Sequence, residues 1–308
     1  MILTKTIRIG TRDSELALWQ ATTVQSQLEA LGYKTELIPV KSTGDLVLDK
    51  PLYELGITGI FTKTLDVAML NDTVDIAVHS MKDVPTQLPQ GIVEAAVLPR
   101  ANVYDILVHK GLDFLADEGL IATGSLRRRA QWLHKYPKHK VVDLRGNVNS
   151  RMQKLKSNTW NGAIFAAAGL ERIDLKPDNF INLDWMIPAP AQGAMLVVAK
   201  QEDAYCREAL ANLNDENTQQ CVQVEREFLR RLEGGCTAPI GALAQLHGET
   251  LVFKGALFSL EGTQKFVVDK TIAISDSKGF GARCADEILT SGGADLMRSI
   301  KKTLATSK

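Results

Sequence analysis

Apolar and polar stretches alternate along the chain in the order typical of an α/β fold. Short apolar runs that indicate buried strands lie at 7–10, 35–40, 76–78 and 91–98. An amphipathic stretch from Leu16 to Leu31 separates the first two runs and ends at Gly32, so the chain opens with a β-α-β unit. A second helical pattern covers 61–70 and follows a long polar connection.

A second unit repeats this layout further along the chain. At 120–129 an apolar strand, a small polar turn and a helix start follow one another, as they do at 7–19. Further apolar strands are predicted at 141–144 and 163–168. Two similar α/β halves favour a ligand-binding cleft between them.

The last third of the chain has a different pattern. An apolar run at 195–199 follows a proline-rich stretch and is predicted to return to the first sheet. A helix is expected at 218–232, alternating strands at 251–259 and 265–274, and helices at 279–290 and 294–303. We therefore expect two α/β domains and a C-terminal α+β domain, with the bounds 1–99 plus 194–212, 100–193, and 213–308.

Composition narrows the class of protein. The 308 residues are 45% hydrophobic and 23% charged, as in ordinary globular proteins. The 36 basic and 36 acidic residues cancel, so no overall field attracts nucleic acid or an anionic membrane surface. No apolar run approaches the ~20 residues that span a bilayer, and the first residues lack a signal-peptide pattern. We expect a cytoplasmic protein that binds neither nucleic acid nor membrane.

The four cysteines are not spaced as in a zinc site or a disulfide framework, so no metal is expected. Cys206, Cys221 and Cys284 lie in helix-like segments and are predicted to be core residues. Cys236 differs because it follows Glu233-Gly234-Gly235, where glycines allow close approach and a thiol can be exposed. A plain turn and a reactive thiol both fit this pattern.

Four polar side chains follow the apolar run at 76–78. They are His79, Ser80, Lys82 and Asp83, and Val84-Pro85 ends the segment because a residue before proline avoids helical geometry. Ligands bind beside the carboxyl ends of strands in open α/β sheets. A solvated turn and a ligand site fit these residues equally well, and we interpret His79 as structural.

Arginines near predicted helix starts are the strongest sign of a ligand. Arg127 and Arg128 fall in the first turn of a helix capped by Thr123 or Ser125, where positive charge opposes the helix dipole. Free backbone N–H groups and guanidinium groups bind anions at such places. Arginines recur in similar positions at Arg12, Arg145, Arg151 and Arg172. A polyanionic small ligand is favoured over nucleic acid, because no RNP-like or helix-turn-helix pattern is present.

Together these motifs resemble those of the porphobilinogen deaminase family, also called hydroxymethylbilane synthases. The matching stretches are Arg12 with Leu16 to Gln20, Val78 to Pro85, Ser125 to Arg128, Leu144 to Val148, Ala168 to Leu170, Gln192 to Ala194, and Glu233 to Cys236. They occur in the family's order over nearly the whole chain.

The resemblance implies two domains like the halves of a type II periplasmic binding protein, an active-site cleft between them, and a third domain. It implies a monomeric transferase of tetrapyrrole (haem) biosynthesis that joins four porphobilinogen molecules head to tail, releases ammonia each time and forms 1-hydroxymethylbilane. By similarity, Cys236 carries a covalent dipyrromethane cofactor and Asp83 is the catalytic carboxylate. The residues implied in binding cofactor and substrate carboxylates are Arg12, Ser80, Lys82, Thr123, Ser125, Arg127, Arg128, Arg145, Arg151, Arg172 and Gln192.

Three positions depart from the pattern of this family. Thr58 replaces a lysine in a flexible loop, Gly124 stands where serine is common, and Ala191 stands where glycine is common. These changes bear on loop closure and turnover rather than on the reaction. A second class of protein also fits the arginines, namely a non-catalytic two-lobed binding protein for small carboxylate anions. Such a protein would need neither Cys236 nor Asp83.

Overall fold

The computed structural model describes residues 5–41, 62–232 and 238–306. The chain divides into two compact units, one of residues 1–47, 57–101 and 193–219, the other of residues 48–56, 102–192 and 220–308. Thr58 and Cys236 lie outside the described residues. The three domain ranges expected from the sequence stay a prediction.

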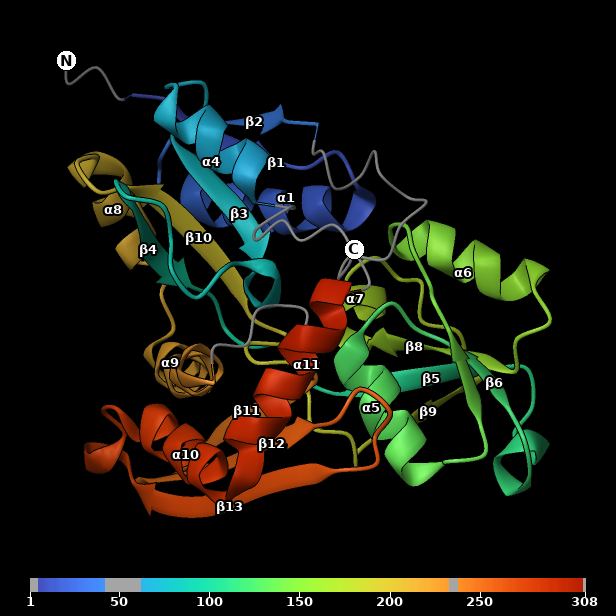
Figure 1. The fold of residues 1–308 in the computed structure, drawn as a ribbon. Helices are drawn as coiled ribbons and strands as arrows, with labels where there is room; N and C mark the ends of the chain where they lie inside the picture. The colour runs from blue at the N-terminus through green and yellow to red at the C-terminus, as the bar shows by residue number, and fades with distance from the viewer. Residues whose placement is uncertain (1–4, 42–61, 233–237, 307–308) are drawn as a thin grey trace. The chain divides into compact units, whose positions relative to one another are not determined.

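A five-stranded sheet forms the centre of the first unit (Figure 1). Its order is β2-β1-β3-β10-β4, with β1 Ile7–Thr11, β2 Thr35–Pro39, β3 Ile76–Ser80, β4 Ile92–Val97 and β10 Met195–Lys200. β1 runs parallel to β2 and β3, whereas β10 runs antiparallel to both of its neighbours, β3 and β4. The predicted return of 195–199 to the first sheet is confirmed.

Among the described residues, the helices that accompany this sheet are α1 Glu15–Ala30, α4 Lys63–Leu70 and α8 Ala204–Ala211. Ala21, Val24 and Leu28 of α1 pack against Ile7 and Ile9 of β1 in one buried core. Ser14 takes the N-cap position of α1 with an extended backbone, as its residue type predicts. The amphipathic pattern after the first strand therefore forms a helix that covers the sheet.

The second unit contains another five-stranded sheet, in the order β7-β6-β8-β5-β9. The strands are β5 Asp105–His109, β6 Leu120–Ala122, β7 Lys140–Val142, β8 Gly162–Ala166 and β9 Phe180–Asn182, and the helices are α5 Leu126–Lys135, α6 Val148–Ser157 and α7 Ala167–Glu171. β6 runs parallel to β7 and β8, whereas β5 runs antiparallel to β8. The repeated strand, turn and helix predicted from the sequence is confirmed at β6 and α5.

The rest of the second unit is an antiparallel sheet in the order β11-β12-β13, with helices beside it. The elements of this part are α9 Glu216–Arg231, whose residues from 220 onward belong to the second unit, β11 Ile240–His247, β12 Thr250–Phe258, β13 Lys265–Ala273, α10 Phe280–Ile288 and α11 Ala294–Thr306. The sequence predicts β12 and β13 but not β11. The turn between β12 and β13 packs on α5, where the Gly262 carbonyl lies 2.7 Å from Nδ1 of His134.

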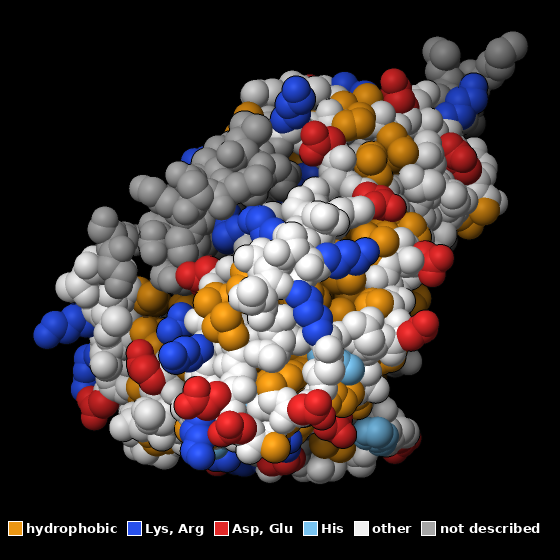
Figure 2. All heavy atoms as spheres, turned by 90° about the vertical axis from the view of Figure 1, so that its right-hand side faces the viewer, with side chains coloured by type: hydrophobic (Ala, Val, Ile, Leu, Met, Phe, Trp, Pro, Cys, Tyr) orange, Lys and Arg blue, Asp and Glu red, His pale blue; other side chains and the backbone are white. Residues whose placement is uncertain are grey.

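The described residues confirm the expected fold class, with two mixed α/β sheets and a C-terminal α+β region. Basic and acidic side chains are interspersed on the face drawn in Figure 2, as the balanced composition leads one to expect. Within the described ranges, none of the helices combines the length and the apolar character that crossing a membrane requires.

Candidate active site

The candidate ligand-binding residues of the second unit gather at one edge of its sheet. β6, β7 and β8 are parallel, so their carboxyl ends meet at the same edge. Thr123 and Arg145 follow β6 and β7, and Arg172 is the C-cap residue of α7, the short helix after β8. β5 runs the opposite way and pairs Asp105 with Ala166, which brings the start of β5 to this edge too. The sheet topology therefore assembles residues from four separate segments.

The start of α5 is fixed by two hydroxyl groups. Ser125 is the N-cap residue, and its Oγ accepts a hydrogen bond from the Arg128 N–H at 3.4 Å. Oγ1 of Thr123 accepts a hydrogen bond from the Ser125 N–H at 3.3 Å. Of the two caps that the sequence allows, Ser125 is the one that forms.

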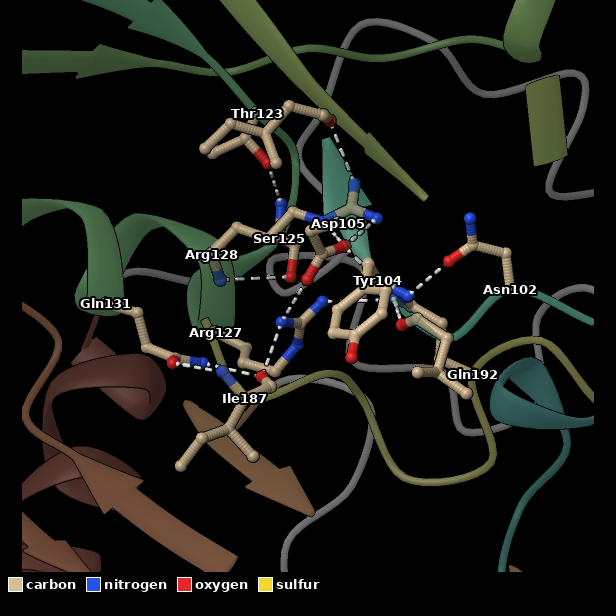
Figure 3. A network of polar contacts seen from close by, with 12 residues as sticks. Asn102, Tyr104, Asp105, Thr123, Ser125, Arg127, Arg128, Gln131, Ile187 and Gln192 are labelled. Atoms are coloured by element: carbon tan, nitrogen blue, oxygen red, sulfur yellow. Dashed lines mark hydrogen bonds and ion pairs between the residues drawn. The ribbon is translucent and has the colours of Figure 1, made fainter. Parts of the chain in front are cut away.

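Arg127 and Arg128 share one buried carboxylate, that of Asp105 (Figure 3). Nη1 of Arg127 donates to Oδ2 of Asp105 at 2.6 Å, and Nε of Arg128 donates to Oδ1 at 2.8 Å. Sequence reasoning missed Asp105. The available signal was an acid placed directly before the apolar residues 106–108, since an acid at the start of a buried strand needs a basic partner.

The loop before β10 completes this network. Gln192 is fully buried, and its Nε2 donates to the Val103 carbonyl at 2.8 Å and to Oδ1 of Asp105 at 3.1 Å. Nη1 of Arg127 donates to the Ile187 carbonyl at 2.8 Å. Arg127 and Gln192 thus both contact Asp105 within the protein, which the sequence did not reveal. Their expected contacts with a ligand stay a prediction.

Guanidinium groups of the second unit lie buried or half-buried near this edge. Burial lowers the pKa of Arg145 and lowers that of Arg172 to about 10, because a charged guanidinium loses hydration there. Nε of Arg127 is buried and has no hydrogen-bond partner among the described residues. Arg151 lies in the first turn of α6 and donates to the Gly146 carbonyl at 2.7 Å. These donors suit a ligand with several carboxylate groups.

The first unit presents its candidate residues at the carboxyl edge of its own sheet. Arg12 follows β1, and Ser80 ends β3, where its Oγ accepts a hydrogen bond from Nε2 of Gln20 at 2.9 Å. Lys82 and Asp83 lie in the single turn 81–83 after β3, and both side chains are half-buried. Among the described residues, the Asp83 carboxylate accepts no hydrogen bond.

His79 points into the interior of the first unit and is 6% exposed. Burial, and secondly the positive charge of Arg12, lower its pKa to about 4. The imidazole is therefore neutral at pH 7 and supplies no positive charge to an anionic ligand. This agrees with the structural interpretation of His79.

Three of the four cysteines lie within the described residues. Cys206, Cys221 and Cys284 are free and buried, as predicted. The ranges that the structure describes contain no cluster of His, Cys, Asp and Glu that could hold a metal.

Two of the three residues that differ from the family pattern, Gly124 and Ala191, lie within the described residues. A Cβ on Gly124 would lie 2.5 Å from the Leu144 carbonyl oxygen, so the backbone packing here favours glycine over serine. Ala191 has a φ of +61°, which L-residues other than glycine rarely adopt.

Comparisons with known proteins cover almost the entire chain. Residues 7–208 match the family model described as porphobilinogen deaminase, dipyromethane cofactor binding domain, and residues 219–290 match porphobilinogen deaminase, C-terminal domain. The curated porphobilinogen deaminase of Syntrophotalea carbinolica is 38% identical, with 96% of each chain covered. That of Trichlorobacter lovleyi is 39% identical over 96% of this chain and 97% of the relative.

Among solved structures, the periplasmic VFT2 domain of Bordetella pertussis BvgS matches with a TM-score of 0.42 and 12% identity. That match covers 68% of this chain and 86% of the BvgS domain.

Proposed function

The chain belongs to the porphobilinogen deaminase family, and from this premise we propose which of its residues perform the reaction of the family. The reaction is the stepwise condensation of porphobilinogen, with release of ammonia at each addition, to give 1-hydroxymethylbilane. Both family models and curated relatives of full length support a transferase. A non-catalytic anion-binding protein is not favoured.

We assign the catalytic role to Asp83. Loss of ammonia from the aminomethyl group of porphobilinogen leaves a cationic azafulvene, and a fixed carboxylate stabilises that charge and the pyrrole N–H. The single observation that supports this assignment is the Asp83 carboxylate itself: it is half-buried at the carboxyl edge of β3 and accepts no hydrogen bond among the described residues. A carboxylate that is already paired with a basic side chain would stabilise the developing cation less.

The arginines of the second unit are assigned to carboxylate binding. Each pyrrole ring carries an acetate and a propionate, so the cofactor and the growing product are polyanions. The buried guanidinium of Arg145, the half-buried guanidinium of Arg172 and the Arg127 Nε, which has no hydrogen-bond partner among the described residues, fit such a ligand. The residues Thr123, Ser125 and Arg151 lie at the same edge and are assigned the same role. In the first unit, carboxylate binding is assigned to Arg12, Ser80 and Lys82.

The dipyrromethane cofactor is assigned to Cys236. When bound, it supplies the pyrrole position to which substrate units are added. The family model that covers residues 7–208 is named for this cofactor, and the donor set described above fits its carboxylates. The covalent link to Cys236 rests on the resemblance of the Glu-Gly-Gly-Cys motif, because Cys236 lies outside the described residues.

Intact mass under denaturing conditions tests this assignment. The purified chain should carry an excess mass equal to two linked pyrrole units, and Cys236→Ala should not. If the native chain is unmodified, it is incubated with porphobilinogen and measured again. A chain that stays unmodified after incubation, or a Cys236→Ala variant that gains the same mass, would contradict the proposal.

We also propose that the enzyme is a cytoplasmic monomer with the three domains 1–99 plus 194–212, 100–193 and 213–308. Porphobilinogen and its products are water-soluble polyanions, which supports a location away from membranes. Light scattering during gel filtration tests the monomeric state.

A further inference from the structure

Gln131 is a buried amide on α5 that pairs with both main-chain groups of Ile187 (Figure 3). Its Oε1 accepts a hydrogen bond from the Ile187 N–H at 2.8 Å, and its Nε2 donates to the Ile187 carbonyl at 2.9 Å. Both residues belong to the second unit, although they are 56 positions apart in the chain. One side chain therefore fixes the main chain at Ile187 against α5.

The Ile187 carbonyl is also a partner of Arg127, which lies one helical turn before Gln131. Residues four apart lie on the same face of a helix, so both side chains can reach the same carbonyl. Nη1 of Arg127 donates to this carbonyl at 2.8 Å and to Oδ2 of Asp105 at 2.6 Å. A carbonyl oxygen has two lone pairs, so it accepts from Arg127 and Gln131 at once.

The contacts of Nη1 determine which edge of the Arg127 guanidinium group is left for a ligand. Nη1 carries two hydrogen atoms, and Asp105 and Ile187 supply an acceptor for each. Among the described residues, Nε has no hydrogen-bond partner, and Nη2 lies 3.5 Å from Oε1 of Gln192. Nε and Nη2 form an edge that can bind a carboxylate through two parallel hydrogen bonds. The direction of this edge follows from where Nη1 is held.

We propose that Gln131 is a positioning residue for Arg127. By holding the Ile187 carbonyl in place, Gln131 sets the plane of the guanidinium group and the direction in which Nε and Nη2 bind a carboxylate. This role rests on the proposed function, in which Arg127 binds a carboxylate of the cofactor or of porphobilinogen. Gln131 itself touches neither, so its loss should weaken binding rather than slow the chemical step.

The test replaces Gln131 by methionine, which has nearly the same length and makes neither hydrogen bond. Two measurements distinguish the two sources of the carboxylate. If Arg127 binds the cofactor, the apoprotein of Gln131→Met should gain cofactor mass from porphobilinogen about tenfold more slowly than the wild type. If Arg127 binds the substrate, the loaded variant should release ammonia with a KM about tenfold higher and a kcat within a factor of about two of the wild type. Wild-type values in both measurements would overturn the proposal.

Gln220→Met is the matched control. Gln220 is half-buried on α9 in the same unit, and its Nε2 donates to Oγ of Ser277 at 3.0 Å. The same chemical change therefore removes a side-chain hydrogen bond that involves neither Ile187 nor Arg127. We expect cofactor uptake and KM to stay at the wild-type values. Equal losses in Gln220→Met and Gln131→Met would overturn the proposal, because they would reflect general destabilisation.

A double-variant cycle tests whether Gln131 acts through Arg127. Lysine keeps the positive charge but lacks the planar fork, so Arg127→Lys has no guanidinium plane for Gln131 to set. In the Arg127→Lys background, Gln131→Met should change the affected quantity by less than about twofold, against about tenfold in the wild-type background. A tenfold effect in both backgrounds would contradict the proposal, since Gln131 would then act independently of Arg127.

A second substitution at the same position is used if Gln131→Met does not fold. The carboxylate of Gln131→Glu keeps an acceptor for the Ile187 N–H but places a second acceptor against the Ile187 carbonyl, so the same loss of binding is expected. Wild-type binding in Gln131→Glu would overturn the proposal. If the wild-type apoprotein gains no cofactor mass and releases no ammonia from porphobilinogen, the proposed function fails. A normal wild type beside an unchanged Gln131 variant refutes the positioning role alone.

Discussion

Nη1 of Arg127 lies 2.6 Å from Oδ2 of Asp105, and the two side chains are 5% and 0% exposed. Arg128 uses the other oxygen of the same carboxylate at 2.8 Å. Two guanidinium groups thus contact one buried carboxylate. Asp105 therefore holds Arg127 and Arg128 in place at the start of α5.

Asp105→Asn is expected to destabilise the protein strongly. The amide keeps the shape but removes the buried negative charge that Arg127 and Arg128 both contact, and removing one partner of a buried ion pair costs about 3 kcal/mol or more. Urea unfolding measures the change in the free energy of unfolding. Asp184→Asn, at an exposed position, is the matched control and should stay near the wild type.

A change of less than about 1 kcal/mol in Asp105→Asn would mean that the pair contributes little to folding. The role of Asp105 would then be limited to orienting Arg127 and Arg128. In that case the variant should fold normally and still bind cofactor and substrate less well.

The sequence predicts the elements whose pattern is local. The apolar runs at 76–78 and 195–199 indicate β3 and β10, because strands covered on both faces are continuously apolar. Residue type predicts that Thr123 or Ser125 caps α5, and the structure shows that Ser125 does. The fold class follows from the same local patterns.

The contacts that pair distant residues are beyond such patterns. Asp105 and Arg127 meet only because β5 lies beside β8 in the sheet. The order of the strands cannot be predicted from the pattern of any single segment. Glu225 stands in a charged run, Glu225-Arg226-Glu227, that has the composition of a solvated helix face. Only the packing of α9 against β11 shows that this one carboxylate is buried.

Asp75 should make stability depend on pH in the acid range. Burial alone would raise its pKa, but hydrogen bonds from Arg8 and Lys5 outweigh that effect and hold the pKa at about 2. Because this is below the ~3.9 of an unfolded Asp, the stabilisation of about 2 kcal/mol is complete above pH ~4 and is lost as pH falls toward 2.

Urea unfolding of the wild type and of Asp75→Asn at several pH values tests the pH range over which this stabilisation is lost. The difference in the free energy of unfolding should be constant at roughly 2 kcal/mol between pH 5 and 7 and should shrink below pH ~4. A difference that persists unchanged at pH 3 would show that Asp75 acts through its shape rather than its charge.

Gly262→Ala should destabilise the protein more than Gly248→Ala. Both glycines lie in turns of the C-terminal sheet and have positive φ values, +72° at Gly262 and +60° at Gly248. Alanine is strained in this backbone conformation, so each substitution lowers the free energy of unfolding by about 1 kcal/mol. A Cβ at position 262 would also lie 2.3 Å from the Ala130 carbonyl oxygen, whereas one at position 248 meets nothing within 4 Å. Overpacking adds about 1 to 3 kcal/mol to Gly262→Ala alone.

Thermal and urea unfolding of the two variants isolate this contact. The difference between them measures how firmly the turn between β12 and β13 is packed on α5, the helix that carries Arg127 and Arg128. Equal destabilisation of both variants would mean that the turn can move away from α5 without cost.

Asp83→Asn should fold and carry cofactor but turn over far more slowly. The amide keeps the shape of the turn 81–83, whose closing hydrogen bond runs between the main-chain groups of Val84 and Met81, so the fold has no need of the charge. A cationic intermediate does need it, and removing one preorganised electrostatic group from an active site typically costs about 10² to 10³ in kcat. We expect a normal melting temperature, a normal cofactor mass and a rate of ammonia release that is lower by at least about 100-fold.

Glu36→Gln, an exposed substitution on β2 of the same sheet, is the control and should leave the melting temperature, the cofactor mass and the rate unchanged. A rate within a factor of about two of the wild type would remove Asp83 from catalysis, since no loss of charge stabilisation that small fits the electrostatic role.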